Sequence, residues 1–133
     1  MPLIASSRLP TFARLQQEGA TVVTPDMALR QDIRELHIGL LNMMPDAALA
    51  ATERQFFRLV GESNQIAQFY MHPFTLKELK RGAEGAAHVQ QYYETFEQIK
   101  AQGLDAHIIS GANVTQPDLT KEPFLEPLIA VID

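Results

Sequence analysis

Cysteine is missing from this chain of 133 residues, and so are most of the short patterns that mark a catalytic or cofactor site. Without cysteine there is no disulfide framework and no thiol nucleophile. The four histidines are not at ligand spacing with one another, and no C-x-x-C pair occurs, so we predict no metal site and no bound cofactor. The glycine patterns that cradle dinucleotides or nucleoside triphosphates are missing as well.

Positive charge and long apolar runs are also scarce. Eleven Lys and Arg residues stand against 16 Asp and Glu, which gives a net charge of −5. Such a chain offers no basic surface for nucleic acid or an anionic membrane. No apolar run approaches the length of a membrane span, and the first residues lack the pattern of a signal peptide. We therefore expect a cytoplasmic protein that binds neither nucleic acid nor membrane.

Residues 38–60 form the part of the chain around which the rest is expected to fold. The apolar run at residues 38–41 predicts a strand buried on both faces. Pro45 cannot continue the ladder, and Asp46 can cap the helix that the following periodicity predicts. A strand that leads through a short loop into a helix is half of a βαβ unit, whose loop faces the ligand crevice in open α/β sheets.

One face of the predicted helix carries a carboxylate among apolar side chains. Two interpretations of Glu53 are open. It could lie at the rim of the core, either solvated or paired with a nearby Arg or Lys, because unpaired acids are rarely buried. It could instead lie beneath a site at the end of the strand and hold the loop. The apolar and polar members of this face are Leu49, Thr52, Glu53, Phe56, Phe57 and Val60.

The rest of the chain alternates strand and helix patterns, which predicts an α/β fold with a flavodoxin-like parallel sheet and flanking helices. Residues 1–31 are interpreted as an N-terminal arm that lies over the sheet or across a neighbouring subunit, with a loose tail as the alternative. Residues 32–133 would form the α/β domain, and the basic cluster at 77–81 a solvated turn. Residues 32–42 lead into and include the strand at 38–41, further strands are expected at 65–71 and 104–110, and helices are expected at 11–17, 47–60, 86–101 and 128–132.

Two details of this prediction concern where elements end. The second strand should stop at His72-Pro73, since proline cannot donate to a ladder. After the third strand, the small residues Gly111, Ala112 and Asn113 let backbone amides approach a ligand, as an oxyanion hole requires, although the same residues form ordinary turns. Three strands are few for a doubly wound domain, and we expect the chain to be truncated.

Several motifs resemble those of the homoserine O-acyltransferases, the homoserine O-succinyltransferase family of methionine biosynthesis. The resemblance covers residues 35–133, and its first motif is the most specific. The matching runs are Leu41-Asn42-x-Met44-Pro45, Thr52-Glu53-x-Gln55-Phe56-x-Arg58-Leu59-Val60, Tyr92-Tyr93-x-x-Phe96-x-x-Ile99, Leu104-Asp105-Ala106-x-Ile108-Ile109-Ser110-Gly111-Ala112 and Glu126-Pro127-Leu128-Ile129.

The resemblance implies a fold like that of the class I glutamine amidotransferases and an acyl transfer from succinyl- or acetyl-coenzyme A to the homoserine hydroxyl. That reaction passes through an acyl-cysteine, with a histidine as base and an acid that orients it. In the family these three residues come after the motifs seen here. The chain would therefore be the N-terminal half of such an enzyme, with no catalytic residue of its own and no activity alone.

The resemblance also implies roles for residues of this chain. The amides of Gly111, Ala112 and Asn113 would stabilise the oxyanion, and Thr115 falls where the family sets its preference for succinyl or acetyl. Three departures bear on the acyl donor and acceptor: Asn113 replaces a proline, Thr115 is neither Gly nor Glu, and residues 46–51 are about two residues longer than usual and lack a lysine. The loop bordering the crevice would include Asn42, Met44, Pro45, Thr52 and Glu53.

A second class of function is open as well. The chain could be a natural short, non-catalytic flavodoxin-like module that binds a small molecule or a subunit. Such a module would have a compact three-strand fold without an exposed sheet edge, whereas the truncated half-domain would leave one edge of the sheet unpaired and an apolar helix face bare. We therefore expect a homodimer.

Overall fold

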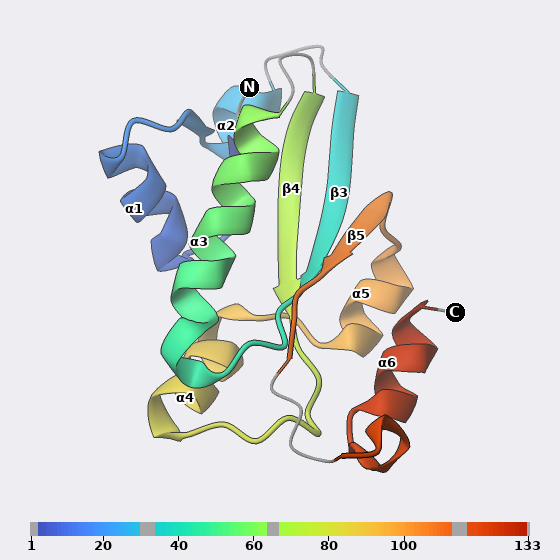
Figure 1. Ribbon diagram of the computed structural model, residues 1–133. Coiled ribbons are helices and arrows are strands. Elements are labelled where there is room, and N and C mark those ends of the chain that lie inside the picture. The colour runs from blue at the N-terminus through green and yellow to red at the C-terminus, as the bar shows by residue number, and fades with distance from the viewer. Residues whose placement is uncertain (1–2, 30–33, 64–66, 113–116, 133) are drawn as a thin grey trace.

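A computed structural model describes residues 3–29, 34–63, 67–112 and 117–132 of the chain. Helices and strands alternate along most of it (Figure 1). No helix in these ranges is long and apolar enough to cross a membrane. The elements are β1 (Leu3–Ile4), α1 (Pro10–Gln17), β2 (Val22–Val23), α2 (Pro25–Leu29), β3 (Arg34–Leu41), α3 (Asp46–Glu62), β4 (Ala67–Phe74), α4 (Ala83–Tyr92), α5 (Phe96–Gln102), β5 (Ala106–Ile109), the 3-10 turn η1 (Leu119–Lys121) and α6 (Leu125–Ile132).

The sheet has five strands in the order β2-β1-β4-β3-β5, and every adjacent pair is parallel. The predicted α/β class with a flavodoxin-like parallel sheet is confirmed. Strand β4 lies on one side of β3 and strand β5 on the other. The connection from β3 to β4 and the connection from β4 to β5 therefore cross the sheet in opposite directions. This reversal is the topological switch point at which open α/β sheets bind ligands, outside the carboxyl ends of the strands.

The N-terminal residues take part in the sheet. The arm was predicted to lie over it, but β1 is inserted between β2 and β4, and Leu3 and Ile4 are fully buried. The physical reason is that β1 and β2 are only two residues long, too short for any alternation pattern to reveal them. The prediction of three strands therefore missed these two. The division of the chain at residue 31 stays a prediction.

Strand β4 continues through proline, contrary to the sequence prediction that His72-Pro73 would end it. Pro73 pairs with Leu40, and its carbonyl accepts from the Glu94 amide at 3.1 Å. The carbonyl of Phe74 points the other way and accepts from Asn42 on the β3 side. Since N and O of one strand residue face the same side, the nitrogen of Pro73 faces away from β3, where β1 has already ended. No ladder hydrogen bond is lost.

The predicted helix over 86–101 is two helices. Tyr93 is extended, with φ −92° and ψ 146°, and Thr95 begins α5 with a capping box in which it exchanges hydrogen bonds with Gln98. The Thr-x-x-Gln spacing is a helix start signal inside an otherwise continuous apolar period. The break allows Glu94 to lie beside the end of β4 as an isolated bridge to Phe74.

Hydrophobic side chains cover both faces of the sheet. On one face, α1 and α3 pack on β1, β3 and β4 through residues that include Phe12, Phe57 and Met71. On the other face, Phe74 and Ile99 lead a second cluster formed with α5 and α6. Figure 1 shows α3 and α1 on one side of the strands and α5 and α6 on the other. Two apolar layers around one sheet account for the stability of the domain.

Candidate functional site

Two loops meet at the switch point, the 42–46 loop after β3 and the loop that begins at Ser110 after β5. The Met43 amide donates to Ser110 Oγ at 2.8 Å, and the Ser110 amide donates to the Leu41 carbonyl at 3.0 Å. A methyl group on Gly111 would lie 3.9 Å from the Met44 sulfur. The structure therefore brings together two segments that the sequence analysis selected separately.

The loop after β5 contains the predicted oxyanion residues. Gly111 is exposed and Ala112 is half-buried. Neither amide donates to an acceptor within the described ranges of the chain. Asn113 and Thr115 lie outside the described residues.

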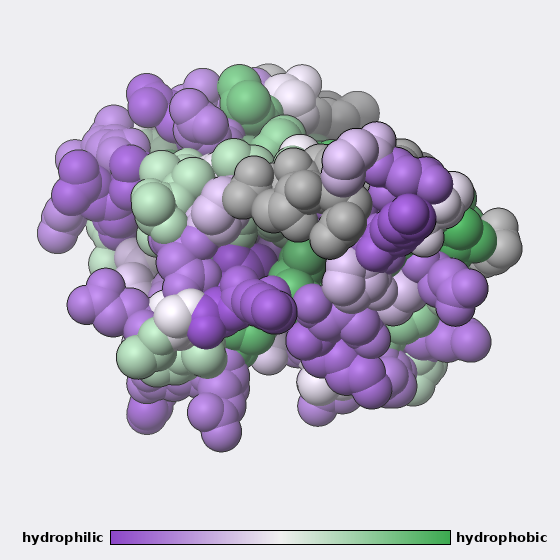
Figure 2. Space-filling view, turned by 60° about the horizontal axis from the view of Figure 1, so that its bottom comes forward, coloured by the Kyte–Doolittle hydropathy of each residue, from purple (hydrophilic) through white to green (hydrophobic). Residues whose placement is uncertain are grey.

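A cavity of about 350 Å³ opens beside the 42–46 loop, and we call it the crevice. Figure 2, in which this end of the molecule comes forward, shows hydrophobic atoms in a hollow between hydrophilic side chains. Its size suits a small ligand and its lining mixes apolar and charged groups, as binding sites do. The lining residues are Met43, Met44, Pro45, Glu78, Leu79, Lys80, Arg81, Glu122, Pro123 and Phe124.

Arg81 is the cation closest to this loop. The sequence analysis placed it in a solvated turn, but its side chain is only 8% exposed. Its guanidinium donates to the carbonyls of Met44 and Asn42 and to the Asp46 carboxylate. The interpretation as a solvated turn is therefore wrong for Arg81, because acceptors from a distant loop enclose its side chain.

Glu53 is fully buried beneath the same loop. Its carboxylate accepts from the Thr11 hydroxyl and, at 3.2 Å, from His88 Nε2, and it is hydrogen-bonded to the Tyr93 hydroxyl. The first interpretation of Glu53, at the rim and solvated or paired with an arginine or lysine, is wrong. Three donors from α1 and α4 and from the residue after α4 satisfy the buried carboxylate, as a buried charge requires.

The Tyr93 hydroxyl connects this carboxylate to the loop. It accepts a hydrogen bond of 3.1 Å from Asn42 Nδ2, which also donates to the Leu49 carbonyl at 2.9 Å. Asn42 Oδ1 in turn accepts from the Met44 amide at 3.3 Å. Burial and the neighbouring Glu53 carboxylate raise the pKa of Tyr93 above its ordinary value, because both disfavour a phenolate. Tyr93 therefore stays a neutral donor.

The remaining predicted residue, Thr52, lies apart from this network. Its side chain is half-buried and makes no hydrogen bond within the described residues. Four residues that sequence reasoning did not select do contribute: Thr11, Arg81, His88 and Tyr93. Tyr93 was named only as part of a family motif and Arg81 only as part of the basic cluster at 77–81. Their contacts with the site, like those of Thr11 and His88, were not predicted, since these partners lie 35 or more residues away in the sequence.

Ligation of a metal ion is not indicated in this region. No group of three or more His, Asp or Glu side chains among the described residues is arranged to hold one.

Comparison with known proteins gives consistent matches over the whole chain. A family model described as homoserine O-succinyltransferase (HTS) matches residues 2–133. Curated proteins named homoserine O-succinyltransferase are similar to the chain: 74% identical over 133 residues in Allochromatium vinosum, 72% over 132 residues in Nitrosococcus oceani, and 48% over 133 residues in Cardiobacterium hominis. The matches cover 99–100% of this chain but only 37–38% of those proteins.

Proposed function

The chain belongs to the homoserine O-succinyltransferase family, and on that premise we propose that the protein that carries it transfers the succinyl group of succinyl-coenzyme A to the homoserine hydroxyl. The chain spans 37% of the length of its first relatives. The observation that carries the proposal is the match of 2–133 together with 74% identity to proteins of that name. Acetyl-coenzyme A is the alternative donor, since Thr115 differs from both residues expected at the position of acyl preference.

The chemistry of this reaction needs a nucleophile that this chain does not contain. A cysteine thiolate would attack the thioester carbonyl and release coenzyme A, and the homoserine hydroxyl would then attack the acyl-cysteine. Since the sequence has no cysteine, we propose that the thiol, the base and the orienting acid come from outside this chain. Alone, the chain should be inactive.

What this chain would supply is the wall of the site. We propose that the amides of Gly111, Ala112 and Asn113 stabilise the tetrahedral oxyanion and that Thr115 bears on acyl preference. The amides of Gly111 and Ala112 donate to no acceptor among the described residues and lie at the switch point, which supports this role. The residues that the family resemblance assigns to the crevice loop are Asn42, Met44, Pro45, Thr52 and Glu53, and this assignment stays a proposal. Of these five, Met44 and Pro45 line the crevice.

The test is an acyl-transfer assay on protein expressed from the complete reading frame. Succinyl- and acetyl-coenzyme A are offered separately with homoserine, and release of coenzyme A is followed together with the mass of the product. We expect O-succinylhomoserine to form at the higher rate. Absence of transfer from either donor would contradict the proposal and favour the non-catalytic binding module as the function.

Assembly and location are proposed as well. A homodimer is supported by the outer edge of β5, which pairs with no other strand among the described residues, and by the exposed Ile129 and Ile132 of α6. Analytical ultracentrifugation should give twice the mass of one chain, and a single-chain mass at every concentration would contradict the dimer. We place the enzyme in the cytoplasm, where acyl-coenzyme A substrates are available.

A further inference from the structure

Arg81 links the 42–46 loop to the segment that precedes α4. Its two terminal nitrogens donate to four oxygen atoms. NH1 contacts the Met44 carbonyl and, at 3.3 Å, Asp46 Oδ1, while NH2 contacts the Asn42 carbonyl at 3.2 Å and Thr75 Oγ1 at 3.1 Å. Two of these acceptors are main-chain carbonyls of the loop itself. One side chain thus binds the peptide group that joins Asn42 to Met43 and the peptide group that joins Met44 to Pro45.

The guanidinium suits this task better than any other cation. It is planar and presents five N–H donors in a rigid fork, whereas a lysine ammonium is a single point charge on a flexible stem. Four acceptors shared between two fixed nitrogens are therefore better met by arginine than by lysine. With a side chain only 8% exposed, Arg81 makes these hydrogen bonds where water competes little.

The other contacts of Asp46 hold the same geometry. Asp46 Oδ2 accepts from the Gly82 amide at 2.5 Å, and the carboxylate lies so close to Gly85 that a methyl group there would be 2.2 Å from Oδ1. The loop therefore cannot move toward α4. On its opposite side the Met43 amide is bonded to Ser110, and Met44 lies beside Gly111.

We propose that Arg81 is a positioning residue for the acyl-transfer site: it holds the 42–46 loop in the conformation in which Met43, Met44 and Pro45 line the crevice next to Gly111. The loop's part in catalysis rests on the proposed function, whereas its dependence on Arg81 is a property of the fold. Arg81 acts through main-chain groups of the loop and through Asp46, which its two terminal nitrogens contact.

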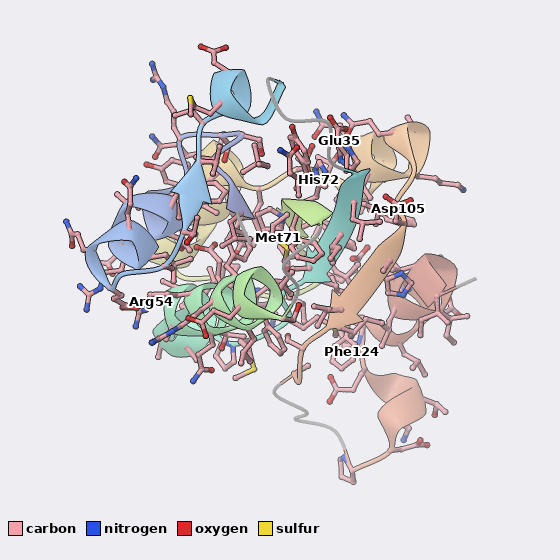
Figure 3. All side chains as sticks on the ribbon, turned by 90° about the horizontal axis from the view of Figure 1, so that it is seen from above. Glu35, Arg54, Met71, His72, Asp105 and Phe124 are labelled. Atoms are coloured by element: carbon pink, nitrogen blue, oxygen red, sulfur yellow. The ribbon has the colours of Figure 1, made fainter. Side chains whose placement is uncertain are left out.

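The experiment uses methionine methyl groups as local probes. In protein labelled with ¹³C at the methionine methyls, Met43 and Met44 report on the loop. Met71 is 4% exposed and lies between the sheet and α3 (Figure 3), so it reports on the core. The variant is Arg81→Lys. The matched control is Arg58→Lys, the same change at an arginine that pairs with Glu62 and Glu18 on the outer side of α3.

We expect Arg81→Lys to shift and broaden the Met43 and Met44 signals while the Met71 signal stays in place. Arg58→Lys should leave all three unchanged. If the Met43 and Met44 signals have the same positions in Arg81→Lys as in Arg58→Lys, the loop does not depend on the guanidinium and the proposal is wrong. If Met71 shifts as far as the loop signals, Arg81 supports the whole fold rather than the loop, which also overturns it.

A kinetic arm links the position of the loop to catalysis in the protein from the complete reading frame. Displacement of site residues by about 1 Å costs on the order of 100-fold in rate, so kcat of Arg81→Lys should fall by about that factor while KM for the acyl donor changes little. An unchanged kcat would show that the position of the loop does not affect acyl transfer, which overturns that part of the proposal. If the unsubstituted protein transfers no acyl group, the proposed function fails, and the methyl signals alone decide the role of Arg81.

Discussion

Two polar clusters contain the same kinds of groups on opposite faces of the sheet. The buried cluster consists of Thr11, Asn42, Glu53, His88 and Tyr93, and the open cluster of Glu35, His37, Tyr70, His72 and Glu94. Each combines carboxylate, imidazole and phenol. The residues of β3 and β4 alternate between the faces, which separates His37 and His72 from the core that contains Met71.

In the open cluster, hydrogen bonds form a chain that ends at the exposed side chain of Glu35. His72 Nδ1 donates to Glu94 at 2.7 Å, which leaves His72 Nε2 to accept from His37 Nδ1 at 2.8 Å. His37 stacks on Tyr70 and reaches Glu35 at 3.4 Å. The side-chain exposure rises along the chain from 14% at His72 to 49% at Glu35. Figure 3 shows Glu35 and His72 near each other.

The difference between the clusters concerns what can replace a lost partner. Water can take the place of Glu35, because half of that side chain is already solvated. Nothing can take the place of Glu53, which is 0% exposed and is the shared acceptor of Thr11, His88 and Tyr93. A buried donor left without an acceptor loses the full free energy of its former hydration. Hydrogen bonds of the same kind should therefore contribute most to the free energy of unfolding in the buried cluster, beneath the 42–46 loop.

The largest effect is expected for Glu53→Ala. It should lower the free energy of unfolding by about 3 kcal/mol, because the Thr11, His88 and Tyr93 donors lose their shared acceptor. Urea denaturation followed by circular dichroism measures the loss. Glu62→Ala, at an exposed position of the same helix, is the control and should stay within about 0.5 kcal/mol. Equal losses in the two variants would contradict the comparison.

His72→Ala should have an intermediate effect, about 1.5 kcal/mol, because both ring nitrogens lose hydrogen bonds at a position only partly reached by water. The measurement is the same urea denaturation, extended to His37→Ala and the double variant. The two losses should not add, since the residues share one hydrogen bond. Strict additivity would mean that the bond between the imidazoles contributes nothing.

Tyr93→Phe should cost about 1 kcal/mol near neutral pH and should change the alkaline limb of the stability profile. The pKa of Tyr93 is raised in the folded state, so above its ordinary value of 10.0 the unfolded chain releases a proton that the folded chain keeps. Its contribution is complete below pH 10.0 and declines as the pH rises.

Urea midpoints from pH 9 to about pH 11 should therefore fall less steeply for Tyr93→Phe than for the unsubstituted protein. Tyr70→Phe is the matched control from the open cluster. Burial and Glu35 raise the pKa of Tyr70 as well, but its side chain is half-buried and its alkaline slope should change less. Identical slopes for Tyr93→Phe and the unsubstituted protein would show that Tyr93 does not retain its proton.

The smallest effect is expected for Glu35→Ala, at most about 0.5 kcal/mol, since its contact with His37 is long and solvated. The same denaturation experiment, run beside Glu53→Ala, compares one carboxylate from each cluster. A loss close to that of Glu53→Ala would mean that exposure does not decide the importance of these groups.

Predictions from the sequence were best where one element determines its own pattern. The strand before Asn42, the helix after Pro45 and the short helix after Pro10 were all anticipated. The predicted cap was wrong, because Asp46 is the first helical residue and its carboxylate accepts from Arg81 and the Gly82 amide instead. Predictions were poorest where an element depends on its neighbours. Pro73 is tolerated in β4 only because β1 is short, and the apolar stripe through Tyr93 concealed a break that Thr95 caps.

The site was anticipated in the same uneven way. Gly111 and Ala112 were selected together with the loop at Asn42, and the structure brings the two loops into contact. Asn113 and Thr115 lie outside the described residues, and the roles of all these residues stay predictions. The carboxylate of Glu53 was noted as unusual, but its partners were not found, because a helical stripe reports which face is buried and not what lies against it.

By itself the sequence determined the class of fold, the strand–loop–helix at residues 38–60 and the family, since these follow from local periodicity and motif spacing along the chain. Only the tertiary structure decided that the Thr11 hydroxyl donates a hydrogen bond to Glu53, 42 residues away. It also decided that Arg81 donates to the carbonyl of Asn42, 39 residues away. Such contacts depend on how crossovers return each element to the sheet, and hydrogen bonds between distant residues leave no periodic signal in the chain.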